Sequence, residues 1–151
     1  FYNLLDEENK RYFSKIADFA FSLGYKVKRA KTKDINFVFT NSKTKKHILK
    51  FSYEKNKAVV KLKYYASRDY SHFFQECIRE TIEEYDFKYT GCYKCGKCKD
   101  GLKGYYYLYP NGRQYFRCGG ELISLPHITE NILPELLDLL KKQHDFYIEQ
   151  N

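Results

Sequence analysis

Four short runs of alternating apolar and polar residues place the strongest constraint on the fold of this 151-residue chain. The runs cover residues 25–30, 35–40, 47–53 and 58–65. Alternation with a period of two is typical of strands that bury one face. Polar segments such as "NSKTK" and "EKNK" separate the runs, and they are too short to hold the crossover helices that parallel neighbours require. The pattern therefore predicts a four-stranded antiparallel meander.

The same alternation predicts a sheet with one apolar face and one basic face. The positions expected to face the core are Val27, Phe37, Phe39, Leu49, Phe51, Tyr53, Val60, Leu62 and Tyr64. Lysines recur on the opposite face, where the candidate residues for binding nucleic acid or another anion are Lys28, Lys50, Lys61 and Lys63. Because lysine side chains attract phosphate groups, this basic face is a candidate binding surface, and the alternative is a face that is only solvated.

Three further segments have the 3.6-residue period of amphipathic helices, at residues 4–23, 69–85 and 132–147. Gly24 follows the first segment, in the position where a left-handed residue commonly ends a helix. Cys77 lies within the apolar stripe of the second segment, where a lone thiol usually acts as a small buried hydrophobe. We therefore expect helices that flank the meander and a third helix at the C-terminus.

Residues 104–118, "GYYYLYPNGRQYFRC", predict a β-hairpin. Asn111 and Gly112 lie between two aromatic runs, and both residue types tolerate the positive φ angles of a tight hairpin turn. The helices, the meander and the hairpin together indicate an α+β fold class. We expect one domain over residues 1–151, in which residues 91–125 form a metal-binding subdomain made of a cysteine-rich, metal-stapled loop and the hairpin.

Three cysteines stand two residues apart in "CYKCGKC", residues 92–98, and a fourth follows at the end of the hairpin. Structural zinc sites have four tetrahedral ligands, and the candidate ligands are Cys92, Cys95, Cys98 and Cys118. A glycine directly after the second cysteine, Gly96, allows the tight turn that such a loop needs. The segment resembles zinc-ribbon and zinc-knuckle modules, over residues 92–120 only. It departs from ribbons in taking three ligands from one side, so His127 could replace one cysteine, or one cysteine could be a spectator.

The spacing of the cysteines leaves other chemistry open. A [4Fe–4S] cluster also uses three closely spaced cysteines and a remote fourth, and a Cys-x2-Cys pair can cycle between dithiol and disulfide. We predict zinc, and a Zn²⁺ ion with four thiolate ligands has a net charge of about −2. Basic residues that could offset this charge are Lys94, Lys97, Lys99, Lys103 and Arg117. Four cysteine ligands leave no open position for a substrate, which favours a structural ion, and the question whether the protein is an enzyme stays open.

The formal charge of the chain is +8, from 27 Lys and Arg against 19 Asp and Glu. This charge favours nucleic acid or an acidic protein segment as a partner, although a genome rich in A/T codons would account for the basicity equally well. No apolar run is long enough to cross a membrane, and no signal peptide begins the chain. With five clustered cysteines, an odd number, these features predict a cytoplasmic protein with reduced thiols. Since the chain contains no methionine, we also expect residues before Phe1.

The histidines offer no catalytic arrangement. His47, His72 and His144 have no partner at helical spacing, and we expect them to be surface or cap residues. The sequence therefore indicates a non-enzymatic, zinc-containing module that binds nucleic acid or an acidic partner through its lysine face. Two alternatives stay open, namely a small-molecule sensor or enzyme with an aromatic pocket, and an iron–sulfur or thiol-redox protein that uses the same cysteines.

Overall fold

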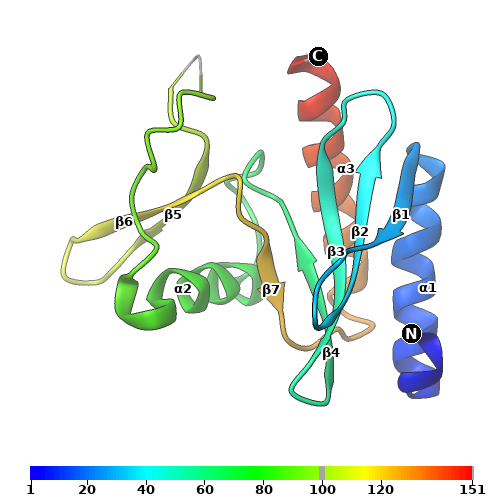
Figure 1. Cartoon of the computed structure of the whole chain (residues 1–151). Coiled ribbons are helices and arrows are strands. Elements are labelled where there is room, and N and C mark those ends of the chain that lie inside the picture. The colour runs from blue at the N-terminus through cyan, green and yellow to red at the C-terminus, as the bar shows by residue number, and fades with distance from the viewer. Residues whose placement is uncertain (99–100, 151) are drawn as a thin grey trace.

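The computed structural model, shown in Figure 1, describes residues 1–98 and 101–150 and has an α+β architecture. Its elements are η1 (Tyr2–Leu4), α1 (Glu7–Ser22), β1 (Tyr25–Arg29), β2 (Ile35–Asn41), β3 (His47–Glu54), β4 (Lys57–Leu62), α2 (His72–Phe87), β5 (Gly104–Leu108), β6 (Gln114–Cys118), β7 (Ile123–Leu125) and α3 (Leu133–Gln150). The strands form a five-stranded sheet in the order β1-β2-β3-β4-β7 and a two-stranded sheet of β5 and β6. The predicted fold class is confirmed, and β7 is an addition to the predicted meander.

The strands β1 to β4 pair antiparallel with their neighbours in sequence, as the alternation predicts. Their apolar positions align across the sheet, so that Phe39 pairs with Leu49 and Leu49 with Leu62. All three side chains are almost fully buried. Val27 belongs to the same row but is 41% exposed, because β1 is an edge strand with a neighbour on one side only.

Helices α1 and α3 cover the apolar face of this sheet. Helix α1 packs against β1, α3 packs against β3, and the two helices also contact each other. Asp6 caps α1 by accepting a hydrogen bond of 2.8 Å from the Asn9 N–H, which satisfies one of the free amides of the first turn. Ile16 from α1 and Leu136 from α3 are fully buried in the resulting core. The opposite face of the sheet is left for other contacts.

Strand β7 pairs with β4 and was not predicted from the sequence. It holds only three residues, too few to show alternation, and its partner lies more than sixty residues earlier in the chain. Ile123 and Leu125 are buried against the core, which gives the pairing its stability. Because α2 packs against β7, this short strand fixes the position of α2 and of the adjoining hairpin at the edge of the main sheet, as Figure 1 shows.

Helix α2 begins later than expected and has an unusual end. Its N-cap is Ser71, whose backbone N–H donates to Glu135 Oε2 of α3 at 2.7 Å. Glu84 leaves the helical conformation, and the next three residues, Tyr85, Asp86 and Phe87, all have positive φ angles. Left-handed residues other than glycine cost roughly 1–2 kcal/mol each, so this turn stores strain at the point where α2 leads into the cysteine segment.

The predicted hairpin forms, with β5 and β6 in register from Gly104 opposite Cys118 to Leu108 opposite Gln114. Gly112 in its turn has a positive φ angle of 87°, whereas Asn111 does not have a positive φ angle, so only one of the two residues uses that conformation. Tyr105 anchors the hairpin in the core, because its hydroxyl accepts from the Tyr64 N–H and donates to the Glu121 carbonyl, each at 3.2 Å. The hairpin is therefore attached to the main sheet at its open end.

Replacing Gly104 by alanine should destabilise this hairpin. The added Cβ would collide with the Arg117 carbonyl oxygen and lie 2.6 Å from the Phe116 ring. Overpacking of this kind costs about 1–3 kcal/mol, so urea unfolding of Gly104→Ala should have a lower midpoint than that of the wild type. Gly120→Ala is the matched control, since its Cβ would meet Cys118 Sγ at an ordinary 3.6 Å. Equal midpoints for the two variants would contradict the close packing of β5 on β6.

Candidate functional site

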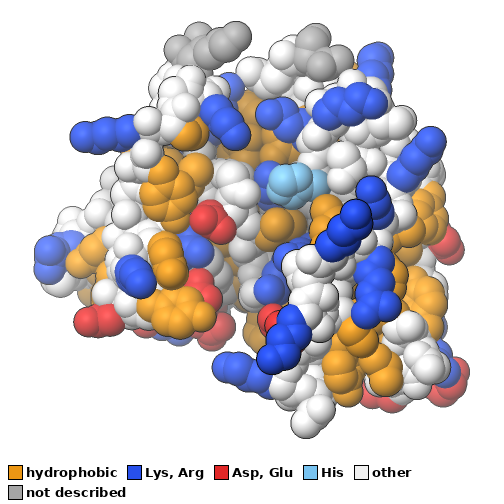
Figure 2. Space-filling view, in the orientation of Figure 1, with side chains coloured by type: hydrophobic (Ala, Val, Ile, Leu, Met, Phe, Trp, Pro, Cys, Tyr) orange, Lys and Arg blue, Asp and Glu red, His pale blue; other side chains and the backbone are white. Residues whose placement is uncertain are grey.

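Three of the predicted lysines form a row on the open face of the main sheet. Lys28 of β1 pairs with Val38, Val38 with Lys50 of β3, and Lys50 with Lys61 of β4. Lys61 in turn pairs with Ser124 of β7, which ends the row. Lys28 is exposed, whereas Lys50 and Lys61 are half-buried. In Figure 2 the Lys and Arg side chains gather over this face of the sheet.

Positive charges crowd one another in this row. Lys50 and Lys61 stand directly opposite each other on neighbouring strands, an arrangement that destabilises a sheet when both carry the same charge. Partial burial, followed by repulsion from Lys61, lowers the pKa of Lys50 below its usual value. Lys61 has an ion pair of 3.2 Å with Glu54, whereas no carboxylate among the described residues lies within ion-pair distance of Lys50. Among the described residues, Lys50 and Lys28 thus lack the ion pair that Lys61 has.

Two basic residues beside the row are affected by the same crowding. Burial and the charges of Lys63, Lys50 and Lys46, in that order, lower the pKa of His47. Lys63, the fourth predicted lysine, follows β4 and is only 5% exposed. Burial first, and then repulsion from Lys46, lowers its pKa to about 8, while Cys118 and Glu121 act in the opposite direction. Lys63 therefore lies in the interior beside the cysteine segment and contributes less to the exposed surface than the other three lysines.

A cleft of about 400 Å³ lies at one end of the lysine row. Its residues come from three parts of the chain: Lys50, Lys61 and Ser124 from the sheet, Glu80, Thr81 and Glu84 from α2, and Arg117, Glu121, Leu122 and Pro126 from β6 and the segment around β7. Figure 2 shows the hollow between the main sheet and the part of the molecule that α2 and the hairpin form. The cleft thus has lysines on its sheet side and carboxylates on its helix side.

Arg117 links the hairpin to α2 beneath this cleft and is only 5% exposed. Its Nη1 donates to the Thr81 carbonyl at 3.0 Å, and its Nη2 lies 3.4 Å from Glu84 and 3.9 Å from Glu121. The Nε atom has no hydrogen-bond partner among the described residues. The Arg117 side chain thus faces α2 and these carboxylates, and its role in offsetting the charge of the cysteines stays a prediction.

The cysteine segment has local features of a metal-binding loop. The Lys94 N–H donates to Cys92 Sγ at 3.3 Å, and the Gly120 N–H donates to Cys118 Sγ at 3.4 Å. Lys94 and Gly96 have positive φ angles, which turn the chain tightly around Cys95. The Gly91 N–H donates to the Phe116 carbonyl at 2.7 Å, so the loop begins alongside β6. Hydrogen bonds from the backbone to sulfur stabilise thiolates and hold them in place for a ligand.

The cysteines are not gathered into one site in the structure. In residues 1–98 and 101–150, no three His, Cys, Asp or Glu side chains are close enough to hold an ion together. Burial raises the pKa of the Tyr65 hydroxyl, hydrogen bonds with Tyr147 and Gln143 lower it, and the Cys98 and Cys118 sulfurs are both close enough to raise it slightly. Lys99 lies outside the described residues. The four-cysteine zinc site is therefore still a prediction.

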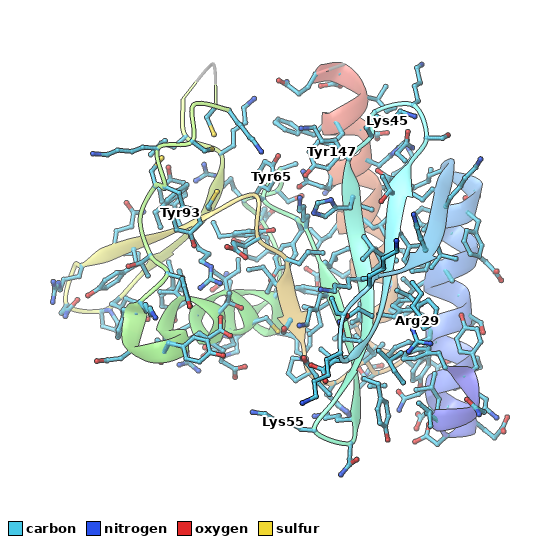
Figure 3. All side chains as sticks on the ribbon, viewed as in Figure 1. Arg29, Lys45, Lys55, Tyr65, Tyr93 and Tyr147 are labelled. Carbon is cyan, nitrogen blue, oxygen red and sulfur yellow. The ribbon has the colours of Figure 1, made fainter. Side chains whose placement is uncertain are left out.

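His127 is not near the cysteines. It lines a cavity together with Asp6 and Asn9 of the α1 N-terminus and Asn56 of the β3–β4 turn. Figure 3 shows that turn, marked by Lys55, at the bottom of the view, well below Tyr93 in the cysteine segment. This position gives no support to the idea that His127 replaces one of the cysteines.

Two other sequence expectations have different outcomes. Cys77 is 3% exposed, as expected for a buried hydrophobe, and burial raises its pKa to about 12. The expectation that His144 is a surface or cap residue is wrong, because its ring is buried and its Nδ1 is 3.1 Å from the Tyr25 hydroxyl. The spacing of His144 from Leu140 and Tyr147, four and three residues away on α3, places it on the buried stripe of that helix.

The aromatic pocket of the alternative hypothesis has a counterpart in the structure. A cavity of about 260 Å³ lies between β5 and the segment before α2, with tyrosines as its main lining. These tyrosines are Tyr65, Tyr70, Tyr105 and Tyr106. Its volume is below the range of about 300–1,000 Å³ that is usual for small-molecule sites, whereas the cleft beside the lysine row lies within it.

Sequence reasoning missed the residues of the cleft other than its lysines. Glu80 and Glu84 are four residues apart, and this spacing places them on one face of a helix. Ser124 could not be found, since it lies on the unpredicted strand β7. The position of Arg117 follows from the hairpin register, in which it shares a face with Tyr105 and Tyr107. The spacing of Glu80 and Glu84 and the hairpin register of Arg117 could therefore have identified these residues as neighbours in space.

Comparison of the chain with protein-family models, with curated proteins and with solved structures gives no match. Its function therefore has to be inferred from its own chemistry. Within the described part of the chain, no helix combines the length and the apolar character that crossing a bilayer requires.

Arg117→Met should loosen the hairpin from α2. The variant keeps most of the side-chain volume but removes the hydrogen bond to the Thr81 carbonyl and the contacts with two carboxylates. We expect the free energy of unfolding to fall by about 1–3 kcal/mol and amide hydrogen exchange to accelerate in β5 and β6 more than in β2 and β3. Arg113→Met, in the exposed hairpin turn, is the control. Unchanged exchange in the hairpin of the Arg117 variant would show that other contacts hold it.

Proposed function

We propose that this protein is a non-enzymatic module that binds nucleic acid through the row of Lys28, Lys50 and Lys61. The observation that carries the proposal is the register that aligns these lysines across three strands, with Lys50 and Lys61 directly opposite each other. Neighbouring strands are about 4.8 Å apart, so the row from β1 to β4 extends over roughly 14 Å. A surface of this length can follow several phosphates of one nucleic-acid strand.

The energetic cost of the row supports a role in binding. Like charges that face each other across strands destabilise a sheet by a few tenths of a kcal/mol to about 1 kcal/mol. A phosphate placed between Lys50 and Lys61 would turn this repulsion into attraction and would release condensed counterions from the nucleic acid. The chain thus keeps an unfavourable pair that an anionic ligand would make favourable.

Exposed aromatic rings favour nucleic acid over an acidic peptide. Tyr89 and Tyr93 are 38% and 47% exposed, and both adjoin residues of the cleft. The Tyr89 ring centre lies 5.5 Å from the Arg117 guanidinium, and the Tyr93 hydroxyl is 3.3 Å from Glu121. Bases stack on exposed aromatic rings, whereas acidic side chains gain nothing from them. The combination of a lysine row and adjacent tyrosines therefore fits a single-stranded nucleic acid best.

Lys50→Glu should weaken nucleic-acid binding while stabilising the protein. The new carboxylate would repel phosphates, but it would also stand opposite Lys61 and form a favourable cross-strand pair worth about 0.2–1 kcal/mol. We expect the affinity for mixed-sequence single-stranded DNA at low salt to fall about tenfold or more in a fluorescence anisotropy titration, with a melting temperature equal to or above that of the wild type.

The control for this variant is Lys15→Glu, which makes the same charge change at an exposed position on α1, the helix that covers the other face of the sheet. It should lower affinity only slightly, because it alters the net charge without touching the row. The proposal fails if the wild type shows no salt-dependent binding, or if both substitutions reduce the affinity equally.

The proposal includes a structural zinc ion held by Cys92, Cys95, Cys98 and Cys118. Its support is the chemistry of four thiols, together with the two hydrogen bonds from backbone N–H groups to Cys92 and Cys118. Such an ion would tie the loop before the hairpin to the end of the hairpin. Because all four ligands come from the protein, it would have a structural role and no open position for a substrate.

Protein purified without added metal should contain about one zinc ion per chain by elemental analysis. We expect Cys118→Ser to lose most of this zinc and to become sensitive to proteases within residues 91–120, since metal binding and folding of such segments are coupled. Cys77→Ala should retain the metal, because Cys77 is buried in the core. A brown protein with iron and labile sulfide would support the iron–sulfur alternative, and metal-free protein that is folded in this segment would contradict both.

A further inference from the structure

We propose that the cleft at the end of the lysine row is a base-selective site, which prefers a nucleobase with an exocyclic amino group over one with a carbonyl oxygen at that position. This inference rests on the proposed function and adds to it a sequence preference. The cleft is formed by the sheet, α2 and the segment around β7, and its volume of about 400 Å³ suits one nucleotide.

The two sides of the cleft carry opposite charges. Lys50 and Lys61 line the sheet side, and Glu80, Glu84 and Glu121 line the side formed by α2 and the segment after β6. A purely anionic ligand would be attracted to one side and repelled by the other. The complementary ligand is therefore anionic at one end and a hydrogen-bond donor at the other, as a nucleotide with an amino-bearing base is.

Glu80 is the acceptor that this arrangement leaves free. Glu84 and Glu121 both lie near Arg117, at 3.4 Å and 3.9 Å, so part of their hydrogen-bonding capacity is already used. Within the described residues, Glu80 has neither an ion pair nor a side-chain hydrogen bond, and it is exposed. A carboxylate oxygen only accepts hydrogen bonds, so it can bind an amino group but not a carbonyl oxygen.

The backbone next to the cleft brings an aromatic ring to it. The left-handed residues Tyr85, Asp86 and Phe87 at the end of α2 follow Glu84 directly. After them the chain reaches Tyr89, whose ring centre lies 5.5 Å from the Arg117 guanidinium. The Tyr89 ring is therefore placed next to a residue that lines the cleft.

Cytosine and thymine test this preference, because both are pyrimidines and differ at position 4. Cytosine has an N4 amino group that can donate to a carboxylate, whereas thymine has an O4 oxygen that a carboxylate repels. Thymine also carries a C5 methyl group and an N3–H that cytosine lacks, so the two bases do not differ at position 4 alone. The decisive observation is therefore a preference for cytosine that depends on Glu80, since the phosphates of the two oligonucleotides are the same.

The experiment is a fluorescence anisotropy titration of the wild-type protein with oligo(dC) and oligo(dT) of equal length, at neutral pH and equal salt. We expect oligo(dC) to bind about tenfold more tightly, a typical value for one good contact between a base edge and a side chain. In Glu80→Gln this ratio should fall to near one, since the amide can also donate to thymine O4. Glu149→Gln, an exposed position on α3 outside the cleft, should keep the full ratio.

The outcomes separate this inference from the proposed function. Equal binding of the two oligonucleotides, with salt dependence and loss in Lys50→Glu, would overturn the base preference and leave nucleic-acid binding by the row intact. The inference would also be overturned if Glu80→Gln kept the preference or if Glu149→Gln lost it. If neither oligonucleotide bound, both the inference and the proposed function would be wrong.

Discussion

The pairing of β7 with β4 is the contact on which the arrangement of the candidate site depends. Val60 pairs with Leu125 and Leu62 with Ile123, and burial of the two β7 side chains stabilises the contact by roughly 1.5–3 kcal/mol each. Without it, β4 would be an edge strand and the lysine row would end at open solvent. With it, α2 is packed against the new edge strand, and the carboxylates of α2 face the lysines of the sheet across the cleft.

The alternation of apolar and polar residues produces both the buried, stabilising face of the main sheet and its basic face. Alternation puts Phe39, Leu49 and Leu62 on the face covered by α1 and α3, where they are almost fully buried. The same register necessarily aligns Lys50 with Lys61 on the other face. Because the buried face supplies far more free energy than the repulsion between two lysines removes, the sheet can keep an unfavourable pair on its open face.

Local patterns predicted most of the fold. Alternation over seven or eight residues, as in β2 and β3, and the Asn-Gly turn of the hairpin each specify an element from neighbouring residues alone, and the structure has those elements. Strand β7 and the left-handed turn after Glu84 depend on contacts with distant parts of the chain, so no local pattern marks them. The lysine row follows from alternation alone, whereas the opposite side of the cleft also requires the packing of α2 against β7, which brings its carboxylates to the sheet.

A sequence pattern can place a residue on one face of a strand or helix, but the contacts of that residue depend on how the elements pack together. Lys63 has the same parity as Lys61, yet it follows the last residue of β4 and is buried beside the cysteine segment. The hydrogen-bond partner of His144 is not among its neighbours in the sequence, because α3 brings the ring to Tyr25, more than one hundred residues away. In both cases burial, which depends on the packing of whole elements, decides the chemistry of the side chain.

Glu121 belongs to the cleft and also contacts the cysteine segment, and this connects the two parts of the proposed function. Glu121 lines the cleft and contacts Arg117, and its other oxygen is 3.3 Å from the Tyr93 hydroxyl in the cysteine loop. Glu121 also stands three residues after Cys118, whose sulfur accepts from the Gly120 N–H. An ion that fixed Cys118 to the loop would fix Glu121 as well. Metal binding would therefore shape the carboxylate side of the cleft while leaving the lysine row on its rigid strands unchanged, so base preference should be more sensitive to the cysteines than phosphate binding is.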